Sequence, residues 1–330
     1  MIEFVPDAIA HGGEAIGRVG GKAHFVEGAM PGERVRGEVT REKKSWARVE
    51  LRDVLEPSPD RVVPPCAHAA ECGGCQWQFA AIEAQLRWKA DIVAGQLRHL
   101  GGIADARVRP TVSAGPPYGY RNRMDFRVVD GAPALYRRRS NDLVPIETCL
   151  LLHPDLSSIF ERLVGLDDAR SVTIRVSTAN GASLAVVTGA LPADAGEWGS
   201  GVVRRLGKER EPVVGPGWIV ETVAETDFRI TADAFFQNNT AGAEVLVALA
   251  GQALEVTSDD TFLDGYAGGG LFGLTVGRGA GRVIAVESDP LALSDLRHNA
   301  EVSGLERRIV PGRVEEVART MDERWDVAVV

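Results

Sequence analysis

Cysteine, aromatic residues and long hydrophobic runs are all scarce in this chain of 330 residues. Its N-terminal segment has no basic stretch followed by an apolar one, so no secretory signal peptide is predicted. No apolar run is long enough to cross a bilayer. We therefore expect a cytoplasmic protein without a membrane partner. Because thiols stay reduced in the cytosol, four unevenly spaced cysteines argue against a disulfide framework.

Differences in composition and residue pattern along the sequence predict three domains, over residues 1–54, 55–232 and 233–330. Residues 1–54 are rich in glycine and short alternating segments, and the spacing of Val35 and Val39 predicts a strand with one polar face. A proline-rich stretch then leads into residues 55–232, which we expect to contain a helix over 82–100 and an antiparallel region of short strands. The fold class of the whole protein is thus a small β-barrel followed by mixed α and β structure.

Residues 233–330 alternate helix and strand. "TFLD", "GRVIAVE" and "WDVAVV" are expected as strands, with helical segments between them. This alternation predicts the beginning of a parallel, doubly wound α/β sheet.

A glycine loop follows the strand "TFLD". "FLDGYAGGGLFGL" contains G-x-G-x-x-G at Gly268, Gly270 and Gly273, and Glu287 closes the next strand. This order indicates a cofactor site in which the acidic residue binds ribose hydroxyls, and the alternative is a tight turn without a ligand. A carboxylate at Asp264 would repel the pyrophosphate of a nicotinamide dinucleotide. S-adenosylmethionine (SAM) carries cationic groups and no phosphate, so it suits an acidic loop better.

Two further residues are expected near this loop. Tyr266 could pack against the cofactor, and Gln237 in "FFQNN" comes where the preceding segment enters the cofactor side of the domain. The neighbouring Asn239 or Thr240 is expected to cap a helix.

Three of the cysteines lie within ten residues. Cys66, Cys72 and Cys75 form C-x5-C-x2-C, and Cys149 is distant in sequence. A thioredoxin-like pair needs a βαβ setting, which this region lacks. A four-cysteine metal centre holding zinc or an iron–sulfur cluster remains, and the three-plus-one spacing favours iron–sulfur.

These pieces together resemble the bacterial RNA 5-methyluridine methyltransferases of the iron–sulfur type, over essentially the whole sequence. "IAHGGEAIGRVGGKAHFVEGAMPGERV" resembles a TRAM domain, an RNA-binding barrel. "CAHAAECGGCQWQ" with Cys149 is similar to the ligand set of a 4Fe-4S cluster, and residues 233–330 to a Rossmann-like SAM-dependent methyltransferase domain. The resemblance implies that Gln237, Tyr266 and Glu287 contact SAM. It also suggests that Asp264 and the loop glycines line the site.

The resemblance implies methyl transfer to C5 of a uridine, expected in 23S ribosomal rather than transfer RNA. In such enzymes a cysteine thiolate adds to C6, C5 takes the methyl group, and a general base removes the C5 proton. All four cysteines are assigned to the metal, so no catalytic residue is assigned within 1–330. We expect the nucleophilic cysteine and a glutamate base after Val330, which would make this sequence incomplete at its C-terminal end.

Net charge is −9, which by itself does not indicate a nucleic-acid partner, but local basic patches can bind RNA. Two basic stretches, residues 34–48 and 120–139, are the candidates, with a solvated charged face as the alternative. The residues expected to hold RNA phosphates are Arg34, Arg36, Lys43, Lys44, Arg121, Arg123 and Arg127. We expect a monomer. A non-catalytic protein that binds SAM or RNA, and a nicotinamide enzyme, are the alternative functions.

Overall fold

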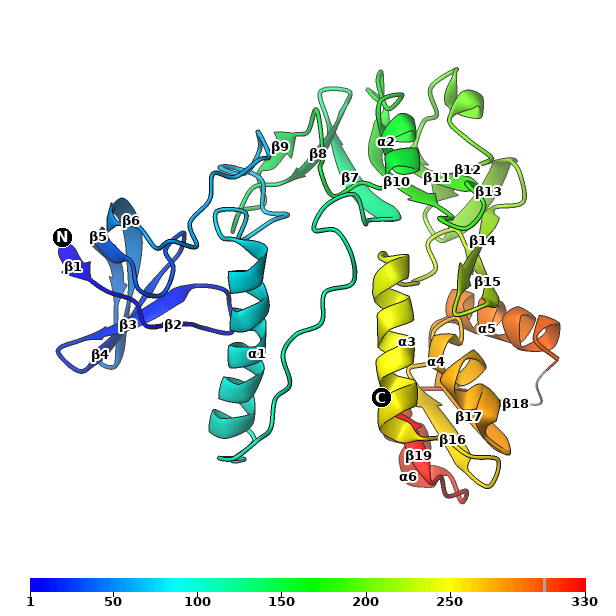
Figure 1. Cartoon of the computed structure of the whole chain (residues 1–330). Helices are drawn as coiled ribbons and strands as arrows, with labels where there is room; N and C mark the ends of the chain where they lie inside the picture. Colours follow the sequence, from blue (N-terminus) through cyan, green and yellow to red (C-terminus); the bar gives the residue numbers. More distant parts are fainter. Residues whose placement is uncertain (305–306) are drawn as a thin grey trace. The chain divides into compact units, whose positions relative to one another are not determined.

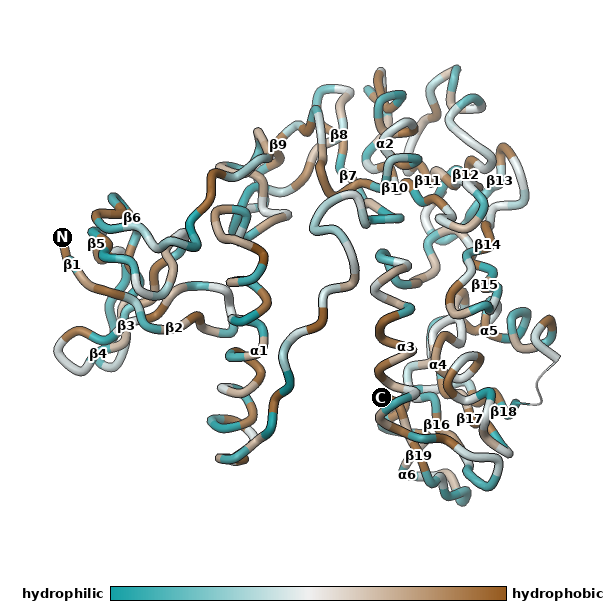
Figure 2. Tube along the Cα trace, viewed as in Figure 1, coloured by the Kyte–Doolittle hydropathy of each residue, from teal (hydrophilic) through white to brown (hydrophobic). Residues whose placement is uncertain are grey.

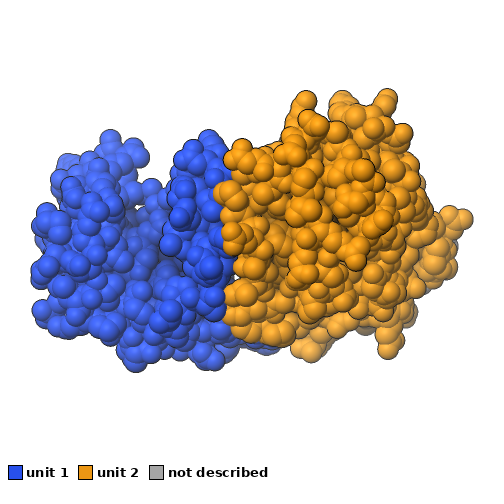
Figure 3. Space-filling model, turned by 90° about the horizontal axis from the view of Figure 1, so that it is seen from above, with its two compact units in different colours: residues 1–113, 136–144 blue, residues 114–135, 145–330 orange. Residues whose placement is uncertain are grey.

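The computed structural model describes residues 1–304 and 307–330, and the protein divides into two compact units (Figure 3). Unit 1 comprises residues 1–113 and 136–144, and unit 2 comprises residues 114–135 and 145–330. The predicted domain boundaries after residues 54 and 232 stay a prediction, because the two compact units are divided at other positions, after residues 113, 135 and 144.

Unit 1 is built on a six-stranded sheet with the order β1-β5-β6-β4-β3-β2 (Figure 1). The predicted strand with one polar face is β5, in which Val35 is fully buried and Arg34 and Glu38 are exposed. The strands are β1 (Ile2–Phe4), β2 (Ala8–Ile9), β3 (Ala15–Val19), β4 (Lys22–Val26), β5 (Arg34–Glu42) and β6 (Trp46–Glu56).

The predicted helix over 82–100 is confirmed as α1 (Ile82–His99), which ends before Gly101. The helix buries Ala84 and Trp88 in the same hydrophobic cluster as the sheet residues Val26 and Val35. Trp88 meets Trp77 edge to face, with ring centroids 5.6 Å apart. The core of unit 1 therefore lies between one face of the sheet and the first half of α1.

A buried ion pair closes one side of this unit. The fully buried carboxylate of Glu33 accepts hydrogen bonds from Nε of Arg61 at 2.5 Å and from Met30 N at 2.9 Å. Ser58 N donates to the same carboxylate at 3.2 Å. Because burial of an unpaired carboxylate is costly, these donors fix the proline-rich stretch against the sheet.

Unit 2 begins with a sheet in the order β13-β12-β11-β10-β7-β8. Its neighbouring strands run antiparallel as predicted, except that β11 and β12 pair in parallel. The strands are β7 (Arg123–Val129), β8 (Ala132–Tyr136), β10 (Ala169–Val176), β11 (Ser183–Gly189), β12 (Gly201–Leu206) and β13 (Glu209–Val214). Short β9 (Leu143–Pro145) falls where the polypeptide returns from unit 1, and α2 (Pro154–Phe160) and the 3-10 turn η1 (Ala195–Glu197) join the strands.

A two-stranded hairpin and a long helix lead from this sheet to the last one. The hairpin pairs β14 (Trp218–Val223) with β15 (Thr226–Thr231), and the helix is α3 (Thr240–Leu254). The side chain of Asn239 caps α3 by accepting a hydrogen bond from Gly242 N at 2.9 Å, as the sequence predicted. The middle of α3 is strongly hydrophobic (Figure 2). Among the described residues of this helix, Ala243 alone is buried.

The last sheet is parallel, with the order β18-β17-β16-β19, as the alternation of elements predicted. Its strands are β16 (Thr261–Gly265), β17 (Arg282–Glu287), β18 (Arg307–Pro311) and β19 (Val327–Val329). The connecting elements are α4 (Leu271–Leu274), the 3-10 turn η2 (Val276–Gly279), α5 (Pro290–Val302) and α6 (Val314–Thr320). The sequence analysis did not predict β18 or α6, and the helical segment expected between "TFLD" and "GRVIAVE" is a short helix followed by a 3-10 turn.

Candidate cofactor-binding site

The glycine loop begins at the carboxyl end of β16, one of the two inner strands of the parallel sheet. The polypeptide passes from β16 to β17 on one side, whereas β19 pairs on the other. In open α/β sheets, ligands bind in the crevice at the carboxyl ends of strands where the strand order reverses. Asp264, Tyr266 and the loop glycines all lie at this point.

Asp264 is turned inward from the loop. Its side chain is 1% exposed, and its Oδ2 accepts a hydrogen bond from Gly273 N at 2.7 Å. A Cβ on Gly273 would come within 2.8 Å of that same oxygen, which explains why glycine is needed there. The carboxylate therefore joins the end of β16 to α4 and determines how the loop between them bends.

Left-handed backbone conformations shape the loop itself. Gly268 has φ of 55° and Gly270 has φ of 96°, values that glycine adopts readily. Tyr266 has φ of 61°, which is a genuine outlier for a bulky residue, and its side chain is 57% exposed. Backbone strain of this kind gathers at functional sites, where the surrounding structure imposes it. A Cβ on Gly268 would meet no atom within 4 Å, so the space beside it is open.

Glu287 closes the loop from the neighbouring strand. Its Oε2 accepts a hydrogen bond from Gly268 N at 2.8 Å, and its Oε1 accepts from Ser288 N at 2.6 Å and Asp289 N at 2.7 Å. Each carboxylate oxygen can accept two hydrogen bonds, so Oε2 keeps one acceptor site for a ligand hydroxyl.

The segment that contains Gln237 lies against the same loop. A Cβ on Gly269 would be 3.7 Å from the ring of Phe236, the residue before Gln237. Two arginines hold this segment by its carbonyls: Nη1 of Arg123 donates to Ala234 O at 3.0 Å, and Nη2 of Arg175 donates to Phe236 O at 3.2 Å. The segment before Gln237 therefore lies beside the glycine loop, and a contact of Gln237 with the cofactor stays a prediction.

A buried carboxylate anchors the start of α3 behind that segment. Glu221 is 1% exposed and accepts hydrogen bonds from Thr178 N at 2.9 Å and Thr240 Oγ1 at 3.1 Å. Nδ2 of Asn122 donates to Thr240 Oγ1 at 2.9 Å and to Gln237 O at 3.2 Å. Gln237 is therefore held by its backbone, which leaves the orientation of its side chain to local packing.

Sequence reasoning missed three residues that support the loop. Nδ2 of Asn299 donates to Gly269 O at 2.9 Å and its Oδ1 accepts from Arg229 N at 2.8 Å, so this side chain of α5 connects the loop to β15. Asp295 accepts from Thr231 N at 2.7 Å and holds α5 itself against β15. Both are 2% exposed. Nη2 of Arg307 donates to Gly273 O at 3.0 Å. Polar residues on the apolar face of a predicted helix were the available signal for the first two.

Burial determines the ionisation of this site. It raises the pKa of Asp264 to about 7, and the Gly273 N–H only partly offsets that rise. Burial, together with nearby Arg278, lowers the pKa of the Arg307 guanidinium to about 10. The buried Asp264 carboxyl, at the end of β16, therefore changes its charge near neutral pH.

The loop offers few free donors to a phosphate. Gly268 N donates to Glu287, Gly273 N donates to Asp264, and Gly270 N donates to Ala267 O at 2.8 Å. Dinucleotide loops bind pyrophosphate through such N–H groups and a helix N-terminus, but α4 has only four residues. The arrangement suits a ligand that presents hydroxyl or cationic groups to carboxylates.

The four cysteines are divided between the units. Cys66, Cys72 and Cys75 lie on one loop of unit 1, and Cys149 belongs to unit 2. Within unit 1, Nη2 of Arg138 donates to Cys75 O at 3.0 Å and holds this loop in place. In residues 1–304 and 307–330, no group of three or more His, Cys, Asp or Glu side chains is close enough to hold a metal ion. The cysteine ligand set therefore stays a prediction.

The candidate RNA-binding residues lie in the two basic stretches, residues 34–48 and residues 120–139. Arg34 is paired with Glu56 at 3.4 Å, and Arg36 with Glu3 at 2.7 Å, whereas Lys43 and Lys44 are exposed in the turn between β5 and β6. Arg123 is bonded to Asp125 at 2.9 Å as well as to Ala234. In the same stretch, Arg121 has a buried Nε without a hydrogen-bond partner among the described residues, and Arg127 is exposed on β7.

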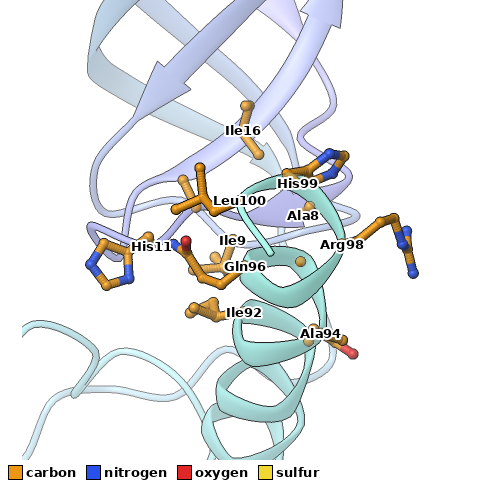
Figure 4. A pocket seen from close by; sticks show the side chains of 13 residues that line it. Ala8, Ile9, His11, Ile16, Ile92, Ala94, Gln96, Arg98, His99 and Leu100 are labelled. Atoms are coloured by element: carbon orange, nitrogen blue, oxygen red, sulfur yellow. The ribbon is translucent and has the colours of Figure 1, made fainter. Parts of the chain in front are cut away.

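Two hollows lie elsewhere. A groove of about 590 Å³ in unit 1 runs between β2, β3 and the second half of α1, with Ile9, Ile92 and Leu100 facing one another and Gln96 among them (Figure 4). A second hollow of about 640 Å³ in unit 2 contains Trp198. Neither includes a residue of the glycine loop, so neither is the cofactor site.

Parallel strands with a glycine loop on one and an acidic residue at the end of the next define a Rossmann-like cofactor-binding domain. No protein-family model matches the sequence. It is 31% identical over 366 residues to an uncharacterized RNA methyltransferase of Gloeobacter violaceus, covering 98% of this chain and 80% of that protein. An uncharacterized RNA methyltransferase of Streptomyces avermitilis is 34% identical, over 94% of this chain and 77% of that protein. The chain belongs to this family of RNA methyltransferases.

A solved structure shows the same fold. The crystal structure of Pyrococcus abyssi tRNA (uracil-54, C5)-methyltransferase with S-adenosyl-L-homocysteine matches with a TM-score of 0.75 and 20% sequence identity. The match covers 100% of this chain and 83% of that one. Within the described part of the protein, no helix is both long and apolar enough to cross a membrane.

The buried carboxyl of Asp264 predicts a pH-dependent stability. Its folded pKa of about 7 lies above the ordinary value of 3.8, so the folded state holds the proton more tightly than the unfolded state does. Stability should therefore fall as pH rises from about 4 to about 7, with roughly 2 kcal/mol lost between pH 5.5 and pH 8. Asp264→Asn keeps an oxygen acceptor for Gly273 but cannot ionise. It should lose this part of the pH dependence in urea unfolding at the two pH values.

Asp259→Asn is the matched control, because Asp259 is exposed in the same unit. That variant should keep the pH dependence of the wild type. An equal pH dependence in wild type and Asp264→Asn would show that Asp264 titrates normally.

Proposed function

We propose that this RNA methyltransferase binds SAM at the glycine loop and methylates C5 of a uridine in RNA. The observation that carries the cofactor assignment is the pairing of the loop N–H groups with the carboxylates of Asp264 and Glu287. A pyrophosphate would compete with both carboxylates for those donors and would be repelled by them. An adenosyl ligand that carries hydroxyl and cationic groups would gain from the same carboxylates.

The residues proposed to hold SAM fit its chemistry. Glu287 would bind a ribose hydroxyl through the remaining acceptor site of Oε2, and the open space beside Gly268 would admit the adenosyl group close to the backbone. The exposed ring of Tyr266 would cover that group, and Gln237 would reach it from the segment before α3. Asp264 would act as a positioning residue through Gly273. When bound, SAM supplies an electrophilic methyl group.

Uracil is the proposed target because the protein shares a fold with a solved uracil-C5 methyltransferase and shows the motifs of that class. C5 of uracil becomes nucleophilic when a thiolate adds to C6, and it then takes the methyl group. A base removes the C5 proton, the C5–C6 double bond forms again, and the C6–S bond breaks to release the thiolate. We assign no residue of 1–330 as the nucleophile or the base. The target base must leave its stack to reach the site. Ribosomal RNA is the proposed substrate, and transfer RNA is the alternative that the solved relative suggests.

Cys66, Cys72, Cys75 and Cys149 are proposed to bind a 4Fe-4S cluster, with zinc as the alternative metal. The support is the donor set, because four thiolates match either metal centre. The proposed role is structural, and no step of methyl transfer uses the cluster.

Cofactor choice can be tested by calorimetric titration. The wild-type protein should bind SAM and S-adenosylhomocysteine, and NADH should not bind. Gly268→Ala should lower the affinity for S-adenosylhomocysteine roughly tenfold or more, because a methyl group placed where a ligand packs costs about 1–3 kcal/mol. Gly207→Ala is the control: Gly207 also has a left-handed φ, of 65°, and open space around it, but it lies in the turn between β12 and β13. Binding of NADH in place of SAM would contradict the proposal.

The uridine target can be tested in cells. RNA from cells lacking the gene should have lost one 5-methyluridine, detected by mass spectrometry of nuclease digests. Ribosomal and transfer RNA are digested separately, and the gene is then restored as the control. Loss from ribosomal RNA would support the proposed substrate, and loss from transfer RNA would support the alternative. If neither RNA changes, uracil-C5 methylation is wrong.

The metal proposal predicts the content of purified protein. Anaerobically isolated wild type should contain iron and acid-labile sulfide, and Cys149→Ser should lose most of both, because each thiolate is a ligand. Zinc without sulfide in the wild type would favour the alternative metal. Wild-type iron content in Cys149→Ser would remove Cys149 from the ligand set.

A further inference from the structure

Two aromatic rings of unit 1 stand outside its hydrophobic core. Phe25 on β4 and Trp46 on β6 are partly exposed and meet edge to face, with ring centroids 6.4 Å apart at an angle of 83°. The buried cluster of unit 1, whose residues are all described, packs against Trp77 and Phe79 and does not include this pair. Stabilisation of the core therefore does not account for Phe25 and Trp46.

Positive charge surrounds the same rings. The guanidinium carbon of Arg41 lies 5.5 Å from the centroid of the Trp46 ring. Lys43 and Lys44 are exposed in the adjoining turn, and Lys43 N donates to Trp46 O at 2.8 Å, which closes the turn beside the ring. Among the described residues, neither lysine has an acidic partner. We refer to Phe25, Arg41, Lys43, Lys44 and Trp46 as the hairpin platform.

The other cations of this basic stretch are compensated. Arg34 is paired with Glu56 at 3.4 Å, Arg36 with Glu3 at 2.7 Å and Arg48 with Glu14 at 3.4 Å. Just beyond the stretch, Arg52 is paired with Glu38 at 2.9 Å. A phosphate that approached these arginines would also approach their acidic partners. The uncompensated charge of the two lysines is therefore concentrated at the turn, next to the aromatic pair.

We infer that the hairpin platform binds an unpaired stretch of the RNA substrate, with a base stacked on Trp46 and the adjoining phosphates on Lys43 and Lys44. The inference rests on the proposed function, because it takes RNA as the partner. Aromatic rings beside lysines are the means by which proteins bind single-stranded nucleic acid, and stacking tolerates any base. Bases inside a duplex cannot stack on a protein ring, so the platform selects loops and unpaired ends.

The test is the affinity of the whole protein for a fluorescein-labelled single-stranded oligouridine and for an RNA duplex of the same length. Trp46→Leu should weaken binding of the single strand roughly five- to hundredfold, and binding of the duplex much less. Trp46→Phe keeps an aromatic face and should stay within roughly threefold of the wild type. Replacing Lys43 and Lys44 together by Ala should reduce the slope of log affinity against log salt by about 1.4.

Two control variants separate the platform from general effects. Arg52→Ala removes a cation of the same sheet that is already paired, and Trp218→Leu removes a tryptophan in unit 2 that is 39% exposed. Both should bind the single strand as the wild type does, and all variants should bind S-adenosylhomocysteine equally. If the wild type binds RNA and Trp46→Leu binds it equally well, the platform is wrong and the proposed function stands. If the wild type binds no RNA at all, both are overturned.

Discussion

The hydrogen bond from Gly273 N to the buried carboxylate of Asp264 is the contact on which the cofactor site depends. It ties the end of β16 to α4, and the loop between them bends through left-handed conformations at Tyr266, Gly268 and Gly270. Burial disfavours the ionised carboxylate, and the structure tolerates this because the same group orders the loop. Ionisation of the buried Asp264 carboxyl near neutral pH therefore lowers the stability of the folded protein.

Once the loop is bent, its neighbours arrange themselves around it. Glu287 takes the N–H of Gly268, and Asn299 takes the carbonyl of Gly269, so strand β17 and helix α5 both hold the loop. Phe236 packs beside Gly269, held by Arg175 through its carbonyl. The carboxylates occupy N–H donors that a pyrophosphate would need, and this occupation is the physical basis for proposing an adenosyl ligand rather than a dinucleotide.

Ion pairing has a comparable role in unit 1. The basic stretch contains enough cations to attract RNA over its whole length, but cross-strand carboxylates neutralise those in the middle of the sheet. The surface left for a polyanion is the turn at Lys43 and Lys44 beside Trp46. Selectivity for unpaired nucleotides would then arise from the uncompensated charges of Lys43 and Lys44 and from the Trp46 ring beside them. These local charges would attract RNA although the net charge of the protein is negative.

Local patterns in the sequence were sufficient to predict the parallel sheet, the helix over 82–100, the glycine loop and the acidic residue after the next strand, because periodicity and glycine spacing depend on near neighbours. Short β18, the break after Leu274 and the parallel pairing of β11 with β12 depend on partners far along the sequence and escaped prediction. Asp264, Gly268 and Glu287 were proposed as site residues from their positions in the sequence, and the structure places them at one end of the parallel sheet. Only the tertiary structure decided that Asp264 is buried, that Asn299 holds the loop and which arginines are neutralised, because burial and ion pairing arise from residues brought together by folding.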